Sequence, residues 1–285
     1  MTHFYYMQGM RMQTFNQDLL SGCFEDFWTP YPLTERLTKK VHMMLSLEGL
    51  ARGPCMICYA PGGGGKTAFA QEVLARSQGW AKKLMMISMQ EDFQNLDLET
   101  SILSQLALPT SAYGFIKSRT VQVRSAMSRL NIGGVIIDDI HELLRLPPEK
   151  QRSSMLFLKG LACNGLSICA LGSNDFQRVF KVEPHLSKYW LVDNLPPFGS
   201  DRELKSFLEV YSRNFRNFKW SCFDAESVSI IHKKTHGLID NVVKVVQVLA
   251  ANASFAGEVE VQSHNVKGID LMLDMFNVRL GELYD

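Results

Sequence analysis

Residues 56–68 read Met-Ile-Cys-Tyr-Ala-Pro-Gly-Gly-Gly-Gly-Lys-Thr-Ala, an apolar run followed by a glycine-rich turn and a helix-favouring sequence. Backbone N–H groups can surround a phosphate in such a turn because the glycines carry no Cβ that would block its approach. Lys66 then brings a positive charge to the β- and γ-phosphates, Thr67 offers a hydroxyl to Mg²⁺, and the following helix directs its N terminus at the anion. The order of strand, turn, Lys-Thr and helix favours a phosphate-binding loop over a plain glycine-rich surface loop.

This loop predicts ATP, together with Mg²⁺, as the bound cofactor. Its first position is unusual because Ala60 replaces the glycine of the common pattern, but a small residue can begin the turn. The expected contacts to the nucleotide are those of Ala60, Pro61, Gly62, Gly63, Gly64, Gly65, Lys66, Thr67 and Ala68.

A second apolar run, Gly133-Gly134-Val135-Ile136-Ile137-Asp138-Asp139, reads as a buried strand with two acids at its C-terminal end. Ligands of parallel sheets bind at that end of the strands. We therefore expect Asp138 to hold Mg²⁺ through its water shell and Asp139 to polarise the attacking water. The alternative, a pair of solvated acids at the edge of a strand, is disfavoured by the phosphate loop upstream.

Composition agrees with a globular nucleotide-binding protein. The chain has 285 residues, of which 46% are hydrophobic, and a formal net charge of +1, so any contact with a polyanion must come from a local patch. No apolar run approaches the roughly 18 residues of a membrane span and no secretory core is present at the N terminus, which predicts a cytoplasmic protein without membrane contact. The six cysteines include one C-x-x-C pair in the apolar run before the loop, and we interpret all six as reduced thiols.

The alternation of elements predicts an α/β fold with a central, mostly parallel sheet and a small C-terminal helical lid. Strands are expected at 55–59, 84–89, 133–139, 166–171 and 189–192, with helices between them at 34–50, 66–77, 98–107, 117–130, 149–163 and from Asp175. After Pro196-Pro197 only helices are expected, at 202–211, 224–234, 241–251 and 266–280. The predicted organisation is an N-terminal arm at 1–27, a nucleotide-binding domain at 28–196, and the lid with a C-terminal tail at 197–285.

Three short runs point to a family. Val135-Ile136-Ile137-Asp138-Asp139-Ile140-His141-Glu142-Leu143-Leu144, Trp28-Thr29-Pro30-Tyr31-Pro32 and Leu171-Gly172-Ser173-Asn174-Asp175 each resemble a motif of the TniB/TnsC family, the AAA+ P-loop ATPases that regulate DNA transposition. The resemblance covers roughly residues 28–250. It implies an ATP-dependent homo-oligomer, a ring or helical filament on duplex DNA, which recruits a DDE transposase and a TniQ-like protein.

The resemblance also assigns residues to the reaction. Ser173 or Asn174 occupies the place where such proteins sense the γ-phosphate, although a simple strand-terminating turn is the alternative. Asp139 stands where the family has Glu, and Lys188 stands where it has an arginine that reaches a neighbour's nucleotide. Aspartate is one methylene shorter and lysine lacks the guanidinium fork, so we expect slow hydrolysis. Lys188 is either that trans contact or a solvated lysine, and Arg178 is a possible substitute.

A local basic face is expected on the helix before the acidic strand. Lys117, Arg119, Thr120 and Arg124 are the candidate DNA contacts, because Lys117, Thr120 and Arg124 share one face at helical spacing. A solvated helix face is the alternative. A second cluster, Tyr211 to Trp220, interleaves bases with aromatic residues, and for it inward packing of the aromatics is favoured over stacking on nucleobases.

Two rival functions stay open at this point. One is a nucleotide-gated scaffold that binds ATP and polymerises but scarcely hydrolyses it. The other is an AAA+ ATPase of the secretion or signalling kind that acts on proteins without DNA. Within the lid, Asn241 and Lys244 are the nearest polar candidates for a nucleotide sensor, and neither is assigned.

Overall fold

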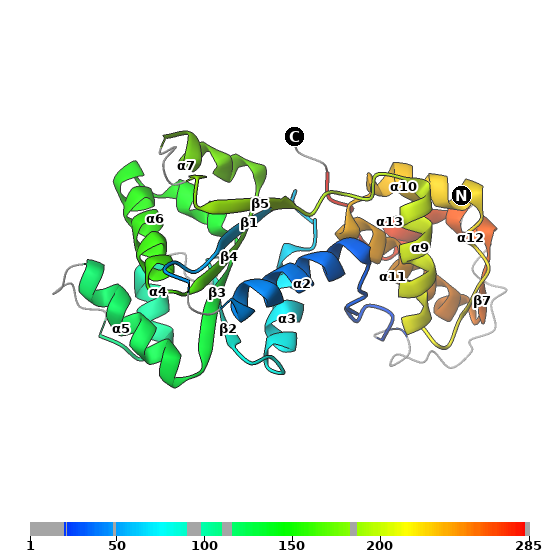
Figure 1. The fold of residues 1–285 in the computed structure, drawn as a ribbon. Helices are drawn as coiled ribbons and strands as arrows, with labels where there is room; N and C mark the ends of the chain where they lie inside the picture. The colour runs from blue at the N-terminus through cyan, green and yellow to red at the C-terminus, as the bar shows by residue number, and fades with distance from the viewer. Residues whose placement is uncertain are drawn as a thin grey trace. The chain divides into compact units, whose positions relative to one another are not determined.

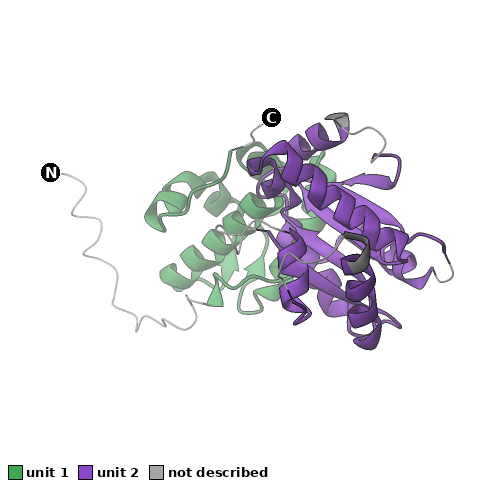
Figure 2. Cartoon of the chain, turned by 90° about the vertical axis from the view of Figure 1, so that its left-hand side faces the viewer, with its two compact units in different colours: residues 1–29, 197–282 green, residues 30–196, 283–285 purple. Residues whose placement is uncertain are grey.

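The computed structural model describes residues 20, 22–47, 50–89, 98–109, 116–182 and 187–282. The chain forms two compact units, which Figure 2 distinguishes by colour. The first unit contains residues 30–196, and the second contains residues 197–282 together with the described part of the chain before Pro30.

The first unit is built on a five-stranded sheet in the order β2-β3-β4-β1-β5, in which every pairing is parallel. The strands are β1 (Cys55–Tyr59), β2 (Lys83–Ser88), β3 (Ile132–Asp138), β4 (Ser167–Gly172) and β5 (Trp190–Asn194). All residues of β1 and β4 are buried, as apolar runs predict for central strands of a parallel sheet. The predicted α/β fold with a parallel sheet is confirmed, with strand bounds shifted by a few residues at most.

Helices cover both faces of this sheet (Figure 1). Alternate residues of β1 point to opposite faces, so Cys55, Ile57 and Tyr59 join a core with apolar side chains of the following helices and turns. The helices of the unit are α2 (Pro32–Ser46), α3 (Lys66–Ser77), α4 (Leu98–Gln105), α5 (Ile116–Arg129), α6 (Pro148–Cys163) and α7 (Gln177–Val182). Two 3₁₀ turns, η1 (Ile140–Arg145) and η2 (Asn174–Phe176), directly follow β3 and β4.

The second unit is mainly helical. It contains α9 (Asp201–Tyr211), η3 (Ser212–Asn214), α10 (Ala225–Thr235), α11 (Ile239–Ala256), α12 (Ser263–Lys267) and α13 (Ile269–Met275). The single helix expected at 266–280 is wrong, because the chain breaks at Gly268 and the second helix ends at Met275. A short parallel pair, β6 (Lys219–Trp220) with β7 (Glu260–Val261), was not expected, since two-residue strands leave no periodicity in the sequence.

The described end of the N-terminal segment packs within this second unit. Gln247 donates a hydrogen bond to the carbonyl oxygen of Glu25 at 3.2 Å, and Asn214 donates one to the hydroxyl of Thr29 at 3.2 Å. The Phe27 ring meets the Phe215 ring edge-on, with centroids 5.6 Å apart. Most of the predicted arm, residues 1–19 and 21, lies outside the described residues.

None of the helices in the described ranges combines the length and hydropathy that a membrane span requires. All six cysteines are free thiols, and only Cys163 is exposed.

Candidate nucleotide-binding site

The phosphate loop follows β1 at the carboxyl edge of the sheet. Tyr59, the last residue of β1, pairs with Gly172 of β4, and the backbone N–H of Ala60 donates to the Gly172 carbonyl oxygen at 2.9 Å. Parallel strands thereby bring the end of β4 beside the start of the loop. The predicted site thus begins at the edge where parallel sheets bind ligands.

The glycines of the loop have different roles. Gly63 and Gly65 have positive φ angles of 69° and 78°, which a residue with a Cβ adopts only at a cost. A Cβ on Gly64 would lie 2.9 Å from the carbonyl oxygen of Pro61, whereas a Cβ on Gly62 would meet nothing within 4 Å. The shape of the loop therefore requires glycine at Gly63, Gly64 and Gly65. At Gly62 the loop itself has room for a side chain, and glycine would be required only to let a ligand approach the backbone.

Lys66 is the first residue of α3 and is only 9% exposed. Its ammonium group donates to the carbonyl oxygens of Pro61 at 3.1 Å and Ala60 at 3.4 Å. The charge is thus held over the loop, beside exposed Thr67 and Ala68 in the first turn of the helix. The first N–H groups of a helix lack intrahelical partners, which makes this N terminus suited to an anion.

Asp138 and Asp139 lie at the end of β3 and are 1% and 5% exposed. Burial raises the pKa of the Asp138 carboxyl, while a hydrogen bond with the Thr67 hydroxyl lowers it. This bond joins the two predicted metal ligands, which come from sequence positions 71 residues apart (138 minus 67). A carboxylate and a hydroxyl are the hard oxygen donors that Mg²⁺ prefers, so the residues present fit that ion. When bound, Mg²⁺ would neutralise charge on phosphate oxygens.

Asp139 adopts a left-handed backbone conformation, with φ 53° and ψ 42°, and directly precedes η1. Its N–H donates to the Asp138 carboxylate at 3.0 Å, and its carbonyl accepts from Glu142 at 2.9 Å. Aspartate tolerates this conformation better than most residues, and the two hydrogen bonds fix it here.

His141, for which the sequence predicted no role, lies beside Asp139. Its Nδ1 lies 3.6 Å from the Asp139 carboxylate and its Nε2 lies 3.9 Å from that of Glu142. Burial lowers the pKa of His141, and the nearby carboxylates oppose this shift. The motif containing His141 was recognised, but only the 3₁₀ turn brings the ring against Asp139.

Ser173 and Asn174 immediately follow β4. Ser173 is half-buried and Asn174 is exposed. The absent Cβ of Gly172 would lie 3.0 Å from Ile140, so glycine lets β4 end against the η1 turn. Ser173 directly follows Gly172, whose carbonyl oxygen accepts the hydrogen bond from Ala60 at the start of the loop.

Neither Lys188 nor Arg178 offers a free cation to the phosphate loop of its own chain. Lys188 is exposed and comes two residues before β5, at the amino edge of the sheet, so it cannot reach the loop of its own chain. The Arg178 guanidinium forms an exposed ion pair with Asp175 at 2.9 Å.

The predicted basic face does not form as one exposed surface. Thr120 is 1% exposed, accepts a hydrogen bond from Asn164 at 3.2 Å and packs against Gly160, where a Cβ would lie 2.8 Å from its methyl group. Its hydroxyl is therefore unavailable to a phosphate, which corrects that part of the expectation. Arg119 pairs with Glu99, Arg124 is exposed, and the side chain of Lys117 lies outside the described residues.

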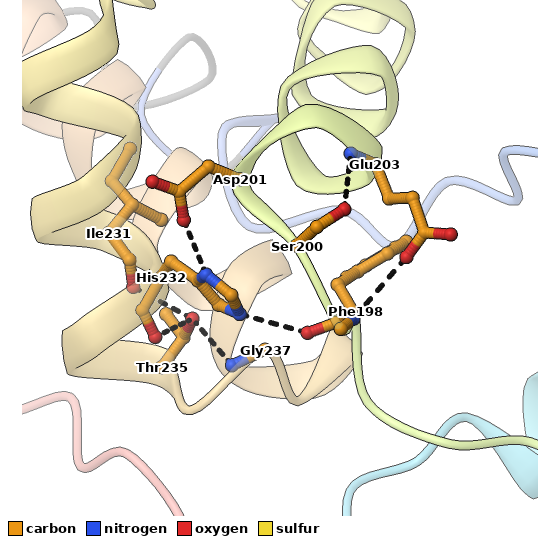
Figure 3. A network of polar contacts seen from close by, with 9 residues as sticks. Phe198, Ser200, Asp201, Glu203, Ile231, His232, Thr235 and Gly237 are labelled. Atoms are coloured by element: carbon orange, nitrogen blue, oxygen red, sulfur yellow. Dashed lines mark hydrogen bonds and ion pairs between the residues drawn. The ribbon is translucent and has the colours of Figure 1, made fainter.

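The start of the lid is held by the polar network in Figure 3. The His232 ring contacts Asp201 through Nδ1 at 2.5 Å and the Phe198 carbonyl through Nε2 at 2.8 Å. The Phe198 N–H donates to the Gly237 carbonyl at 2.9 Å, and Gly237 has a φ of +68°. These contacts join the segment after Pro196-Pro197 to the turn that opens α11.

The two unassigned lid residues are engaged elsewhere. Asn241 is 1% exposed, donates to the carbonyl oxygen of Gly281 at 2.8 Å and accepts from its N–H at 2.7 Å. Lys244 forms an ion pair with Asp240 at 2.7 Å. Both side chains thus stabilise the lid itself.

The aromatic cluster packs inward, as the favoured interpretation predicts. The Trp220 ring stacks on Phe223 with centroids 5.7 Å apart and also contacts Phe215 at 5.8 Å. Arg213 and Arg216 line, together with these rings, a cavity of about 480 Å³.

The chain resembles known proteins in sequence and in fold. A family model described as "Bacterial TniB protein" matches residues 21–200. No curated protein matches the chain.

Solved structures show the fold. The Aeropyrum pernix ORC1 protein in complex with DNA is 18% identical, with a TM-score of 0.64 over 89% of this chain and 69% of that chain. The Aeropyrum pernix ORC2 protein, in ADPNP–ADP complexes, is 16% identical, with a TM-score of 0.63 over 87% of this chain and 70% of that chain. Domain III of the Thermotoga maritima replication initiation protein DnaA is 14% identical, with a TM-score of 0.55 over 93% of this chain and 99% of that chain. The chain therefore has the AAA+ fold.

Proposed function

The chain belongs to the TniB family, and on that premise we propose that it is an ATP-dependent regulator of DNA transposition. In this proposal the protein binds ATP and Mg²⁺ between protomers and assembles as a ring or filament on duplex DNA. It links target-site selection to the recruitment of a DDE transposase and a TniQ-like protein in the cytoplasm.

The observation that carries the proposal is the assembly of the phosphate loop and the acidic strand at one edge of the sheet. Lys66 is held over the loop, and Thr67 hydrogen-bonds to Asp138. These three side chains lie close together, and in the proposal the lysine binds the phosphates while the two oxygen donors bind Mg²⁺. The family is identified from the sequence, and this arrangement of side chains independently supports nucleotide binding.

The same geometry supports slow turnover. Asp139 directly follows the proposed metal ligand Asp138, and its backbone is fixed by two hydrogen bonds. Its carboxylate would orient the attacking water, but from one methylene further back than a glutamate. Ser173 or Asn174, after β4, would contact the γ-phosphate, and Lys188 would act on the nucleotide of a neighbour.

Duplex DNA is proposed as the platform for assembly. One similar structure is described as a complex with DNA, and another as Drosophila ORC bound to DNA. In this chain Arg124 and Lys117 are the proposed phosphate contacts, because Thr120 is buried and Arg119 is paired with Glu99.

The test is negative-stain imaging of the purified protein with duplex DNA, with and without Mg²⁺ and a non-hydrolysable ATP analogue. We expect rings or filaments on DNA only when analogue and Mg²⁺ are both present. Lys66→Ala should abolish them because the phosphates lose the positive charge. Lys150→Ala is the matched control, since Lys150 is exposed and lies in α6 outside the loop.

The outcome separates the three functions. Nucleotide-dependent assemblies on DNA support the proposal, and their affinity for DNA should fall as salt rises. Assemblies that form and persist with ATP, without phosphate release, would indicate the nucleotide-gated scaffold. Particles indifferent to DNA would refute the transposition proposal in favour of an ATPase that acts on proteins.

A further inference from the structure

The His141 side chain lies beside Asp139, and the His141 backbone packs against the end of a neighbouring strand. The Nδ1 atom of the ring is 3.6 Å from the Asp139 carboxylate, and the side chain is 24% exposed. A Cβ on Gly172, the last residue of β4, would lie 3.7 Å from the His141 nitrogen and 3.8 Å from its Cβ. His141 is thus held by η1 on one side and by β4 on another, close to the acid that is proposed to orient water.

The Nδ1 atom of His141 is a buried polar atom that, within the described ranges, has no hydrogen-bond partner. Such an atom is costly because it has lost its bonds to water without gaining others. Its separation from the Asp139 carboxylate exceeds the length of a hydrogen bond, which is about 2.7–3.2 Å. Hydrogen bonds of catalytic groups are often long without substrate and shorten when it binds. A small rotation of the ring or the carboxylate is enough to form this one.

The nearby acid Glu142 is already engaged. Its carboxylate forms an ion pair with Arg145 at 2.8 Å, and it approaches the other ring nitrogen of His141, Nε2, only to 3.9 Å. Asp139 is therefore the carboxylate that can accept from Nδ1.

The protonation of the ring agrees with a donor at Nδ1. Burial lowers the pKa of His141, so the ring is neutral at pH 7 and carries one proton. An ionised carboxylate only accepts hydrogen bonds. Contact with Asp139 therefore favours the tautomer with the proton on Nδ1.

Asp139 has a fixed backbone but a side chain with few contacts. Its N–H and carbonyl oxygen both form hydrogen bonds within the turn. Among the residues that the structure describes, His141 is the one ion-pair contact of its carboxylate. A group that orients water must itself be held in one direction, since small misplacements lower the rate steeply.

We propose that His141 is a positioning residue for ATP hydrolysis, in which its Nδ1–H donates to one oxygen of the Asp139 carboxylate and leaves the other oxygen to orient the attacking water. The inference rests on the proposed ATPase function and adds to it a residue that acts through Asp139. A hydrogen bond to an ionised acceptor is stronger than one between neutral groups, so a single ring can hold the carboxylate. His141 keeps its proton throughout, and the reaction needs only ATP and water.

The first experiment measures ATP hydrolysis as phosphate release, together with the affinity for a fluorescent non-hydrolysable ATP analogue. His141→Phe keeps a ring of similar size without the N–H, and His141→Asn places an amide N–H near the position of Nδ1. His141→Phe should lower kcat on the order of 10- to 100-fold with KM and analogue affinity unchanged. His141→Asn should restore most of this loss. His264→Ala is the matched control, since His264 is exposed in α12 of the second unit.

A second measurement does not depend on turnover. Nuclear magnetic resonance of protein with isotope-labelled histidine reports which ring nitrogen carries the proton. The His141 signals are those that disappear in His141→Asn. The nucleotide-free wild type should have the proton of His141 on Nδ1, whereas Asp139→Ala should shift it towards Nε2, which a free imidazole side chain prefers.

Each contrary outcome has its own meaning. Wild-type kcat in His141→Phe overturns the proposal, and equal losses in His141→Phe and His141→Asn overturn it because they indicate lost packing. Weaker analogue binding by His141→Phe, or a wild-type ring protonated on Nε2, also overturns it. Failure of the wild type to bind the analogue would instead refute the proposed nucleotide site. Analogue binding without any phosphate release would refute the positioning role and leave the nucleotide-gated scaffold.

Discussion

Replacing Gly237 by alanine should loosen the lid while the nucleotide-binding unit stays intact. Gly237 has a φ of +68°, and a Cβ there would lie 2.4 Å from the Phe198 carbonyl oxygen and 3.0 Å from the Phe198 nitrogen (Figure 3). Both are backbone atoms, so the segment must shift. The left-handed conformation costs alanine about 1–2 kcal/mol. Loss of the hydrogen bond from Phe198 to Gly237 adds about 1 kcal/mol.

The expected loss of about 2–3 kcal/mol can be measured by amide hydrogen exchange. Amides of α10 and α11, which flank Gly237, should exchange roughly 30- to 150-fold faster, because every 1.4 kcal/mol is a factor of ten. Amides of α3 in the first unit are the internal reference and should not change. Gly199→Ala is the matched control, since its Cβ would come no closer than 3.9 Å to Glu203. If the amides of α10 and α11 exchange in Gly237→Ala as slowly as in the wild type, the predicted clash between a Cβ at position 237 and the Phe198 backbone is refuted.

Other predictions concern the nucleotide site. Asp138→Asn should stabilise the nucleotide-free protein at neutral pH and abolish Mg²⁺-dependent analogue binding, since the amide avoids burying a charge; thermal unfolding and analogue titration check both effects. The raised folded-state pKa of Asp138 means that the folded state holds this proton more tightly than the unfolded state. The wild type should therefore lose stability relative to Asp138→Asn as pH rises from about the ordinary value of 3.8 through the raised pKa, and an unchanged difference in denaturant titrations would contradict this. Gly65→Ala should lower the free energy of unfolding by about 1–2 kcal/mol, as measured by denaturant titration. Gly62→Ala should leave the free energy of unfolding unchanged and weaken binding of the ATP analogue, as measured by analogue titration. Restoring Asp139→Glu and Lys188→Arg should raise ATP hydrolysis sharply, measured as phosphate release, and no change would count against a turnover limited by these two residues.

The sequence predicts the strands and helices of the first unit well because its signals are local. β1 and α3 have the expected bounds, since an apolar run, a glycine turn and a helix-favouring stretch follow one another without a gap. The lid is predicted less well. Gly268 ends a helix that the periodicity would continue, and β6 with β7 pair across 41 residues (260 minus 219).

The amino-acid sequence by itself determined the parallel α/β fold, the phosphate loop and the acids at the end of β3, because each of these depends on a contiguous run with its own chemistry. Only the tertiary structure decided that Thr120 is buried, that His141 lies against Asp139, and that the Thr67 hydroxyl bonds to Asp138. It alone brings Arg52 and Lys159 to the ring of Tyr189. The physical reason is that these contacts depend on strand register and helix packing, which join residues far apart in the chain and leave no pattern within any one segment.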